Sequence, residues 1–271
     1  PIPATQLRLR LLFCNGCRAI TDFPGKPALA GTRLSKLMAQ QGLCSRREAD
    51  RLIASGRVLV DGVVVNQLGI RVNPDADICL SAQAARHRKT LATILLNKPP
   101  GYVSNLPEKG YPEAVSLIRR ENQQRGRSDH GNDSAPAAST LNVAGRLDID
   151  SSGLLVLTQN GSIARRLISP DSRVEKEYRV RVSDSFDDHT IAQLCHGLSL
   201  DGRVLRPARV TRQGTHQLMF VLTEGRKRQI RRMCELVGLK VNNLTRTRIG
   251  GVTLGHLPRG QWRYLESGEQ F

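Results

Sequence analysis

The stretch Gly145-Arg146-Leu147-Asp148-Ile149-Asp150-Ser151-Ser152-Gly153-Leu154 decides how the rest of the chain is interpreted. Leu141 and Val143 precede it, and a continuous apolar run, Leu154 to Leu157, follows. A polar segment bounded by glycines between two apolar runs predicts a loop between two strands. A carboxylate on such an anchored loop is a common place for chemistry, although an aspartate in a turn is more often structural. Asp148 is therefore a candidate whose role depends on the other segments.

Two other interpretations of this loop are disfavoured. Asp148 and Asp150 fall at the first and third positions of a calcium loop, but the twelfth is Gln159, which has no bidentate carboxylate to offer. A phosphotransfer loop of the Asp-x-Asp type would follow an apolar strand directly, whereas Gly145 and Arg146 interrupt the strand here. We therefore expect neither a calcium site nor a phosphotransfer site at this loop.

The composition indicates a folded protein with a polyanionic partner. The chain has 271 residues, a formal charge of +17 and 39% hydrophobic residues, which suits one large and one small domain with real cores. Nucleic acid is the first candidate partner and an anionic membrane surface the second. No apolar run approaches the length of a membrane span. Aromatic residues are only 4%, so base stacking on an aromatic platform is not the main binding mode.

The six cysteines do not form the pattern of a disulfide framework. Cys14 and Cys17 form a lone C-x-x-C with no second pair at zinc-ribbon spacing, which disfavours a zinc site. The other four stand alone in regular patterns, which predicts buried thiols in a reducing compartment such as the cytoplasm. These four are Cys44, Cys79, Cys195 and Cys234.

Residues 1–32 form an irregular extension, with organelle targeting as a weaker alternative. Residues 33–80 form a compact module. A helix from Leu34 ends near Gly42, and a capping box, Ser45-Arg46-Arg47-Glu48, starts a second helix. Asp61-Gly62 between two valine-rich runs predicts a hairpin with a type I′ turn.

Two arginines in the capping box, Arg46 and Arg47, oppose the dipole of the helix that they start. A bound phosphate would reverse the sign of that interaction, whereas a solvated charged face is the alternative. The segments Arg33–Leu37, Gly42–Ala49 and Gly56–Gly62 resemble the RNA-binding module named after ribosomal protein S-four. The resemblance implies an RNA-facing surface made of Arg33, Lys36, Ser45, Arg46, Arg47 and Arg57.

Residues 81–90 are polar and basic and predict a linker, and residues 91–271 form a second domain. Strands are expected at Leu91–Leu96 and 176–182, a helix at Glu113–Arg120, and a mobile insertion at 121–139. Further strands and helices alternate to the end of the chain. The fold class is therefore α+β, in which a small α/β module joins a larger domain whose mainly antiparallel mixed sheet is flanked by helices.

The densest basic run, residues 225–232, opens an amphipathic helix. Helical periodicity turns Arg231 towards the buried side and Arg228 and Arg232 outward. Because a buried unpaired charge is very costly, Arg231 needs a carboxylate partner, for which Asp148 is a candidate.

The second domain resembles an RsuA/RluF-type pseudouridine synthase over residues 91–265. Five segments occur in that family's order: Asn97-Lys98-Pro99-x-Gly101, Gly145–Leu154, Glu175-Lys176-Glu177-Tyr178, Gly225–Met233 and Arg246-Thr247-Arg248-Ile249. The resemblance implies isomerisation of uridine to pseudouridine without a cofactor. It also implies that the catalytic residues are Asp148, Tyr178 beside the target ring and Arg231 as the basic partner of the aspartate.

The same resemblance implies that Arg146 helps hold the RNA with the base flipped out, and the basic run adds Arg226, Arg228 and Arg232 as RNA-binding candidates. Tyr178 could instead be a core aromatic, and Arg231 a surface phosphate contact. The expected partner is ribosomal RNA, large-subunit 23S favoured and 16S possible, or a ribosome assembly intermediate, bound by a monomer. The competing hypothesis is a catalytically silent ribosomal-RNA-binding protein.

Overall fold

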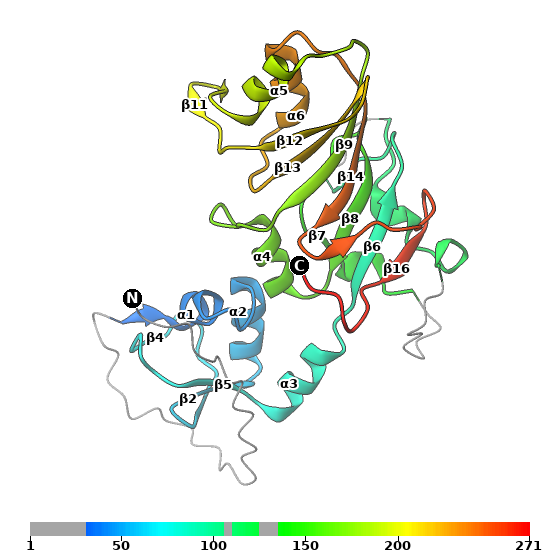
Figure 1. Cartoon of the computed structure of the whole chain (residues 1–271). Coiled ribbons are helices and arrows are strands. Elements are labelled where there is room, and N and C mark those ends of the chain that lie inside the picture. Colours follow the sequence, from blue (N-terminus) through cyan, green and yellow to red (C-terminus); the bar gives the residue numbers. More distant parts are fainter. Residues whose placement is uncertain (1–30, 106–109, 125–134) are drawn as a thin grey trace. The chain divides into compact units, whose positions relative to one another are not determined.

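The computed structural model describes residues 31–105, 110–124 and 135–271, and it divides into two compact units at the boundary between Thr90 and Leu91. Figure 1 shows both units. Residues 1–30 of the expected extension, and residues 125–134 of the expected insertion, lie outside the described ranges. None of the helices in those ranges combines the length and the apolarity that crossing a membrane requires.

The first unit packs two helices on small sheets. The capping box predicted at its second helix is confirmed: the Glu48 amide donates to the Ser45 hydroxyl and the Ser45 amide to the Glu48 carboxylate. The predicted type I′ hairpin is confirmed by positive φ at Asp61 and Gly62. The elements are β1 (Thr32–Arg33), α1 (Leu34–Gln40), α2 (Arg46–Ala54), β2 (Val58–Val60), β3 (Val63–Val65), β4 (Arg71–Val72) and β5 (Ile78–Leu80). Strands pair in the order β3-β2-β5, and β1 pairs with β4.

The segment expected to be a linker is a helix, α3 (Ala82–Lys89). The Ser81 hydroxyl accepts from the Ala84 amide, and Ala84 is buried in the core of the first unit. The small residue Ala84 attaches this helix to the core, and the polar composition of the segment gave no indication of a helix.

The second unit is built on a nine-stranded sheet with the main path β12-β13-β9-β14-β8-β6-β16 (Figure 1). Every pairing is antiparallel except the one between β14 and β8, which confirms the expected mainly antiparallel sheet. The strands are β6 (Thr93–Lys98), β7 (Asn142–Val143), β8 (Ser152–Thr158), β9 (Lys176–Val182), β12 (Arg209–Gly214), β13 (Gln217–Leu222), β14 (Val241–Ile249), β15 (Val252–Thr253) and β16 (Trp262–Tyr264). A hairpin of β10 (Ser199–Leu200) and β11 (Arg203–Val204) stands apart from this sheet.

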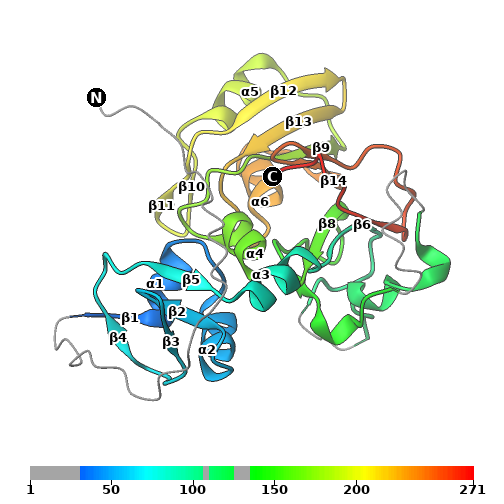
Figure 2. The ribbon, with the colours of Figure 1, turned by 90° about the horizontal axis from the view of Figure 1, so that it is seen from below.

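Three α-helices flank the sheet: α4 (Gly161–Ile168), α5 (Asp188–Cys195) and α6 (Gln229–Leu236). Figure 2 shows α5 beside β12. The helix predicted at Glu113–Arg120 was wrong, because the segment forms short 3-10 turns, η1 (Ala114–Leu117) and η2 (Arg120–Asn122), with a third, η3 (Ala138–Thr140), further on. The Trp262 indole donates to the Arg119 carbonyl at 2.8 Å, which holds this segment against β16.

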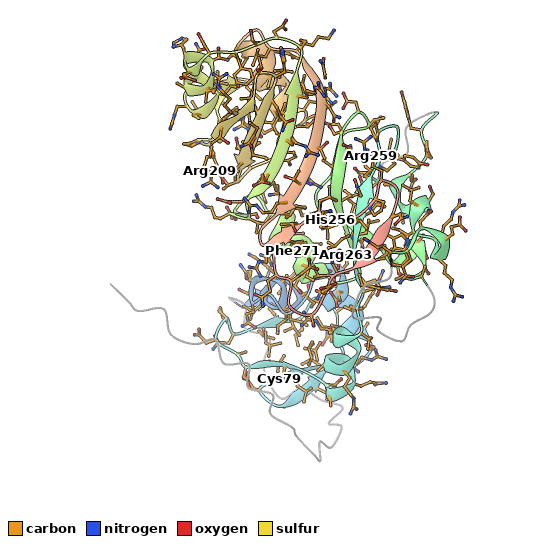
Figure 3. The ribbon with its side chains drawn as sticks, turned by 45° about the vertical axis from the view of Figure 1, so that its right-hand side comes forward. Cys79, Arg209, His256, Arg259, Arg263 and Phe271 are labelled. Atoms are coloured by element: carbon orange, nitrogen blue, oxygen red, sulfur yellow. The ribbon has the colours of Figure 1, made fainter. Side chains whose placement is uncertain are left out.

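The main core lies under the alternating strand β9, where Tyr178, Val180 and Val182 face inward and Arg179 and Arg181 face solvent. This confirms the predicted half-buried strand. Among the described residues, Cys44, Cys195 and Cys234 are free thiols. Burial raises the pKa of Cys44 and of Cys234 to about 12, so these thiols are unreactive. Cys195 is half-buried. Cys79 is exposed on β5 (Figure 3), which corrects the expectation that it is buried, since its position alternates outward.

Candidate active site

The predicted loop lies between β7 and β8, as the sequence indicated. Every residue of β8 is buried, so the loop is anchored at its carboxyl end in the core. Asp148 is half-buried, and its carbonyl accepts from the Ser151 amide at 3.1 Å. In the described part of the chain, the Asp148 carboxylate forms neither a hydrogen bond nor an ion pair. It is therefore available to a ligand.

The loop is held from one side by the segment that follows β6. The Ile149 carbonyl accepts from the Gly101 amide at 2.8 Å and lies 3.5 Å from Lys98 Nζ. The Ser104 hydroxyl donates to the Leu147 carbonyl at 2.7 Å and accepts from the Leu147 amide at 2.9 Å. Each residue flanking Asp148 is thus fixed through its main chain.

Arg246 on β14 holds the other half of the loop. Its guanidinium donates to the carbonyls of Gly145 at 2.9 Å and of Leu154 at 2.7 Å, and reaches that of Arg146 at 3.3 Å. The same guanidinium carbon lies 6.0 Å from the centre of the Tyr178 ring, within cation–π range. Arg246 is 1% exposed. A single buried cation therefore joins the Asp148 loop to the tyrosine on β9.

Gly153 allows this arrangement because β8 and β14 approach closely where they run parallel. Gly153 pairs with Arg246, and a Cβ on Gly153 would lie 2.3 Å from the Arg246 carbonyl oxygen. Its φ of +103° is also one that residues with side chains rarely adopt. Only glycine accommodates both constraints.

Arg231 on α6 points inward, as periodicity predicted, but its carboxylate partner is Asp150 rather than Asp148. Arg231 Nε lies 3.2 Å from Asp150 Oδ2, in an ion pair without hydrogen-bond geometry. Its two terminal nitrogens donate to the carbonyls of Asp150 and Val241, both at 3.1 Å. Arg228, in the left-handed conformation at the start of α6, donates to the same Asp150 oxygen at 3.0 Å. Asp150 therefore fastens the loop to the basic helix.

Lys98 is a buried cation next to the loop. It occurs in the segment Asn97-Lys98-Pro99-x-Gly101, but no role was predicted for it. It is 0% exposed, and its ammonium donates to the carbonyls of Pro99 and Tyr102, both at 2.9 Å. Burial lowers the pKa of Lys98 to about 8, against the raising influence of Asp150 and then of Asp148. Lys98 is the last residue of the buried strand β6, and a lysine in such a strand indicates a buried cation, although it does not indicate which carbonyls the cation binds.

The predicted RNA-binding arginines of this unit divide into two groups. Arg146 is exposed and its guanidinium has no partner among the described residues. Arg226 donates to the carbonyls of Leu200, Arg203 and Val204. Arg232 forms a bidentate pair with Asp201 at 2.9 and 2.7 Å. Arg226 and Arg232 thus fasten the β10–β11 hairpin to α6, which the sequence did not predict.

In the first unit, the predicted RNA-facing cations Arg33, Lys36, Arg46 and Arg47 are exposed. Ser45 is half-buried and its hydroxyl is engaged in the capping box. Arg57 is half-buried. The exposed four have no ion-pair partner among the residues that the structure describes.

The arrangement offers a free carboxylate, an aromatic ring and fixed guanidinium groups. Within the described ranges, no cluster of three or more His, Cys, Asp and Glu side chains could hold a metal ion. A carboxylate can act as a nucleophile or base. The structure links Arg231 to the loop through Asp150, and it links Tyr178 to the loop through Arg246. The catalytic roles of Asp148, Tyr178 and Arg231 stay predictions, and no role was predicted for Arg246 or Lys98.

Both units of the chain are similar to known proteins. The family model for RNA pseudouridylate synthase matches residues 92–236, and that for the S4 domain matches residues 32–78. The dual-specificity RNA pseudouridine synthase RluF of Escherichia coli O6:H1 is 34% identical over 89% of this chain and 77% of that protein. The ribosomal small subunit pseudouridine synthase A of Escherichia coli K12 is 32% identical over 88% and 97%. A crystal structure of a pseudouridylate synthase matches with a TM-score of 0.59 and 27% identity, over 86% and 96% of the two chains.

Proposed function

The chain belongs to the RNA pseudouridylate synthase family, and we propose that it acts on a uridine of ribosomal RNA with Asp148 as the reacting carboxylate. The observation that supports this role is the geometry of the loop. Its main chain is fixed by Ser104, Arg231 and Arg246, whereas the Asp148 carboxylate has no partner in the described structure. A fixed loop with one free reactive group is the preorganised arrangement that catalysis requires.

The proposed reaction needs a uracil outside its helix, because the ring is out of reach while it is stacked. The bond from ribose to ring nitrogen breaks, the ring turns, and ribose bonds to carbon five. Carbon five then loses its proton and the released ring nitrogen gains one, so the product is an isomer of the substrate. Asp148 attacks the ring, attacks the sugar or abstracts a proton. Tyr178 lies beside the turning ring. Arg231 acts through Asp150, which it holds by side chain and carbonyl, so we assign it a positioning role.

The charged surfaces support RNA binding by both units. Arg33, Lys36, Arg46 and Arg47 form the proposed surface of the S4 domain, and Arg146 extends from the Asp148 loop itself. Contacts to phosphates position the RNA without reading its sequence. Such contacts make the affinity fall steeply with salt.

We assign the target uridine to large-subunit RNA, with small-subunit RNA as the alternative outcome. The resemblance of Glu175–Tyr178 and Arg246–Ile249 to the RluF-type branch supports this choice. A ribosome assembly intermediate in the cytoplasm is the proposed setting, and a monomer the proposed active form.

The test compares Asp148→Asn with Asp184→Asn, a control at an exposed position whose carboxylate accepts a hydrogen bond from the Ser183 hydroxyl. Pseudouridines are mapped in ribosomal RNA from a strain lacking the chain and restored with each variant. We expect Asp184→Asn to restore the missing pseudouridine and Asp148→Asn to bind RNA within a few-fold of the parent without forming product. Product from Asp148→Asn would remove Asp148 from its role. RNA binding by the parent without any pseudouridine would favour the silent RNA-binding protein.

A further inference from the structure

A second buried cation, Lys176, lies beside the active site. It stands two residues before Tyr178 on β9 and is therefore on the same face of the sheet. Lys176 is 8% exposed, and its ammonium donates to a single described acceptor, the Val174 carbonyl at 3.1 Å. Two of its three N–H groups remain for another acceptor.

The charges around Lys176 are positive. Burial lowers its pKa first, and Arg246 and then Arg206 lower it further. Arg246 donates only to carbonyls, so two of its five N–H groups are also unused. No ion pair joins Lys176 or Arg246 to a carboxylate of residues 31–105, 110–124 or 135–271. Neither of these two buried cations therefore forms an ion pair in the described structure.

The acidic neighbours of Lys176 do not supply that counter-ion. Glu175 and Glu177 alternate to the other face of β9, where both pair with Arg248 at 3.0 and 3.4 Å. Thr247 donates to Glu177 at 2.8 Å, which fixes that carboxylate further. Glu175 and Glu177 are thus adjacent to Lys176 in the sequence, but Arg248 holds both carboxylates on the opposite face of the sheet.

Stability does not explain this pair of cations. A buried charge without a partner is costly, and an apolar residue of similar size in its place is often neutral or stabilising. A buried cation without a carboxylate partner therefore indicates that its counter-ion is an anionic group of the ligand. Phosphate matches this requirement, because it accepts several hydrogen bonds and carries a full charge, whereas the uracil ring is neutral.

We propose that Lys176 and Arg246 form an anion site for a backbone phosphate of the nucleotide being isomerised. This inference rests on the proposed function, since it takes the ligand from the RNA substrate. Arg246 contacts the Asp148 loop and the Tyr178 ring at once, so a phosphate held there fixes the sugar relative to both. The half-buried Arg206, which donates to the carbonyls of Pro170 and Ser172, borders the site.

The experiment measures binding of uridine 3′,5′-bisphosphate and of uridine to the full chain at constant ionic strength, by calorimetry or NMR. Lys176→Met removes the charge at similar size, Lys176→Arg keeps it, and Lys240→Met is a matched control at an exposed lysine just before β14. We expect the preference for bisphosphate over uridine to fall about tenfold to a hundredfold in Lys176→Met, the range of a charged hydrogen bond. Lys176→Arg should retain most of the preference and Lys240→Met all of it.

Uridine 3′- and 5′-monophosphates then show which phosphate is bound, and inorganic phosphate as a competitor separates a phosphate on the nucleotide from the free ion. Lys176→Met should melt no lower than the parent, because it removes an uncompensated charge. A lower melting temperature with unchanged bisphosphate preference would show a structural lysine and overturn the proposal. Intact, Lys176-dependent binding without any pseudouridine product would instead refute the proposed function.

Discussion

Replacing Gly153 with alanine tests whether the close approach of β8 and β14 builds the site. The new Cβ would lie 2.3 Å from the Arg246 carbonyl oxygen and 2.7 Å from its amide nitrogen, and neither atom belongs to a flexible side chain. The two strands must separate by about 1 Å to reach an ordinary contact distance. Overpacking of this kind costs about 1–3 kcal/mol. The backbone at φ +103° adds about 1–3 kcal/mol for a residue with a side chain.

Gly145→Ala separates these two contributions. Gly145 has a similar φ of +97°, but the nearest atoms to its Cβ would be 4.0 Å away. It therefore incurs the backbone cost without the steric one. We expect Gly153→Ala to lower the free energy of unfolding by about 2–6 kcal/mol, and by about 1–3 kcal/mol more than Gly145→Ala.

Urea unfolding followed by tryptophan fluorescence measures this difference. Trp262 is the single tryptophan and is 0% exposed, so its signal reports on the second unit. Pseudouridine formation should also fall, by up to about a hundredfold, because a displacement near 1 Å of Arg246 misplaces the Asp148 loop. The reasoning would be refuted if the two alanine variants unfolded at the same urea concentration with the same slope.

Two further predictions concern the groups that hold the loop. In Asp150→Asn, Arg231 loses its ion pair, and we expect product formation to fall at least about tenfold while RNA affinity stays within a few-fold of the parent. Single-turnover assays measure the rate of product formation. An unchanged rate would contradict the positioning role of Arg231. For Lys98, burial lowers the folded-state pKa from 10.5 to about 8, so the unfolded chain binds more protons between these values and stability should rise with pH across that window by at most about 3 kcal/mol. Urea unfolding at pH 8 and pH 10 should show a smaller gain in the free energy of unfolding for Lys98→Met than for the parent. An equal gain in the two proteins would contradict the lowered pKa of Lys98.

Local signals in the sequence predicted much of the fold. The Ser45–Glu48 capping box, the Asp61-Gly62 turn and the alternation along β9 were confirmed because each depends on neighbours within a few residues. The helix expected from Glu113 was wrong, and the helical structure of residues 82–89 was missed, for the opposite reason. Trp262, far along the chain, fixes the first segment, and burial of Ala84 in the core stabilises the second.

The site was predictable to the extent that it depends on side-chain type and periodicity. Helical spacing turned Arg231 inward correctly, but two carboxylates on one loop, Asp148 and Asp150, are equivalent partners until the backbone is placed. The roles of Lys98 and Arg246 were not predictable, because both bind main-chain carbonyls. A carbonyl is present at every residue, so binding to it leaves no pattern in the sequence.

The loop is held by hydrogen bonds to its main chain, so its conformation does not depend on every side chain that it carries. Because the donors from Lys98, Ser104 and Arg246 reach carbonyl oxygens, these hydrogen bonds do not involve the side chains of Arg146, which is exposed, and Ile149, which is half-buried. Substitutions at these two positions can accumulate, or be introduced by design, while Asp148 stays where it is. Related proteins can therefore come to modify different RNAs by changing surface side chains while the backbone of the loop stays the same.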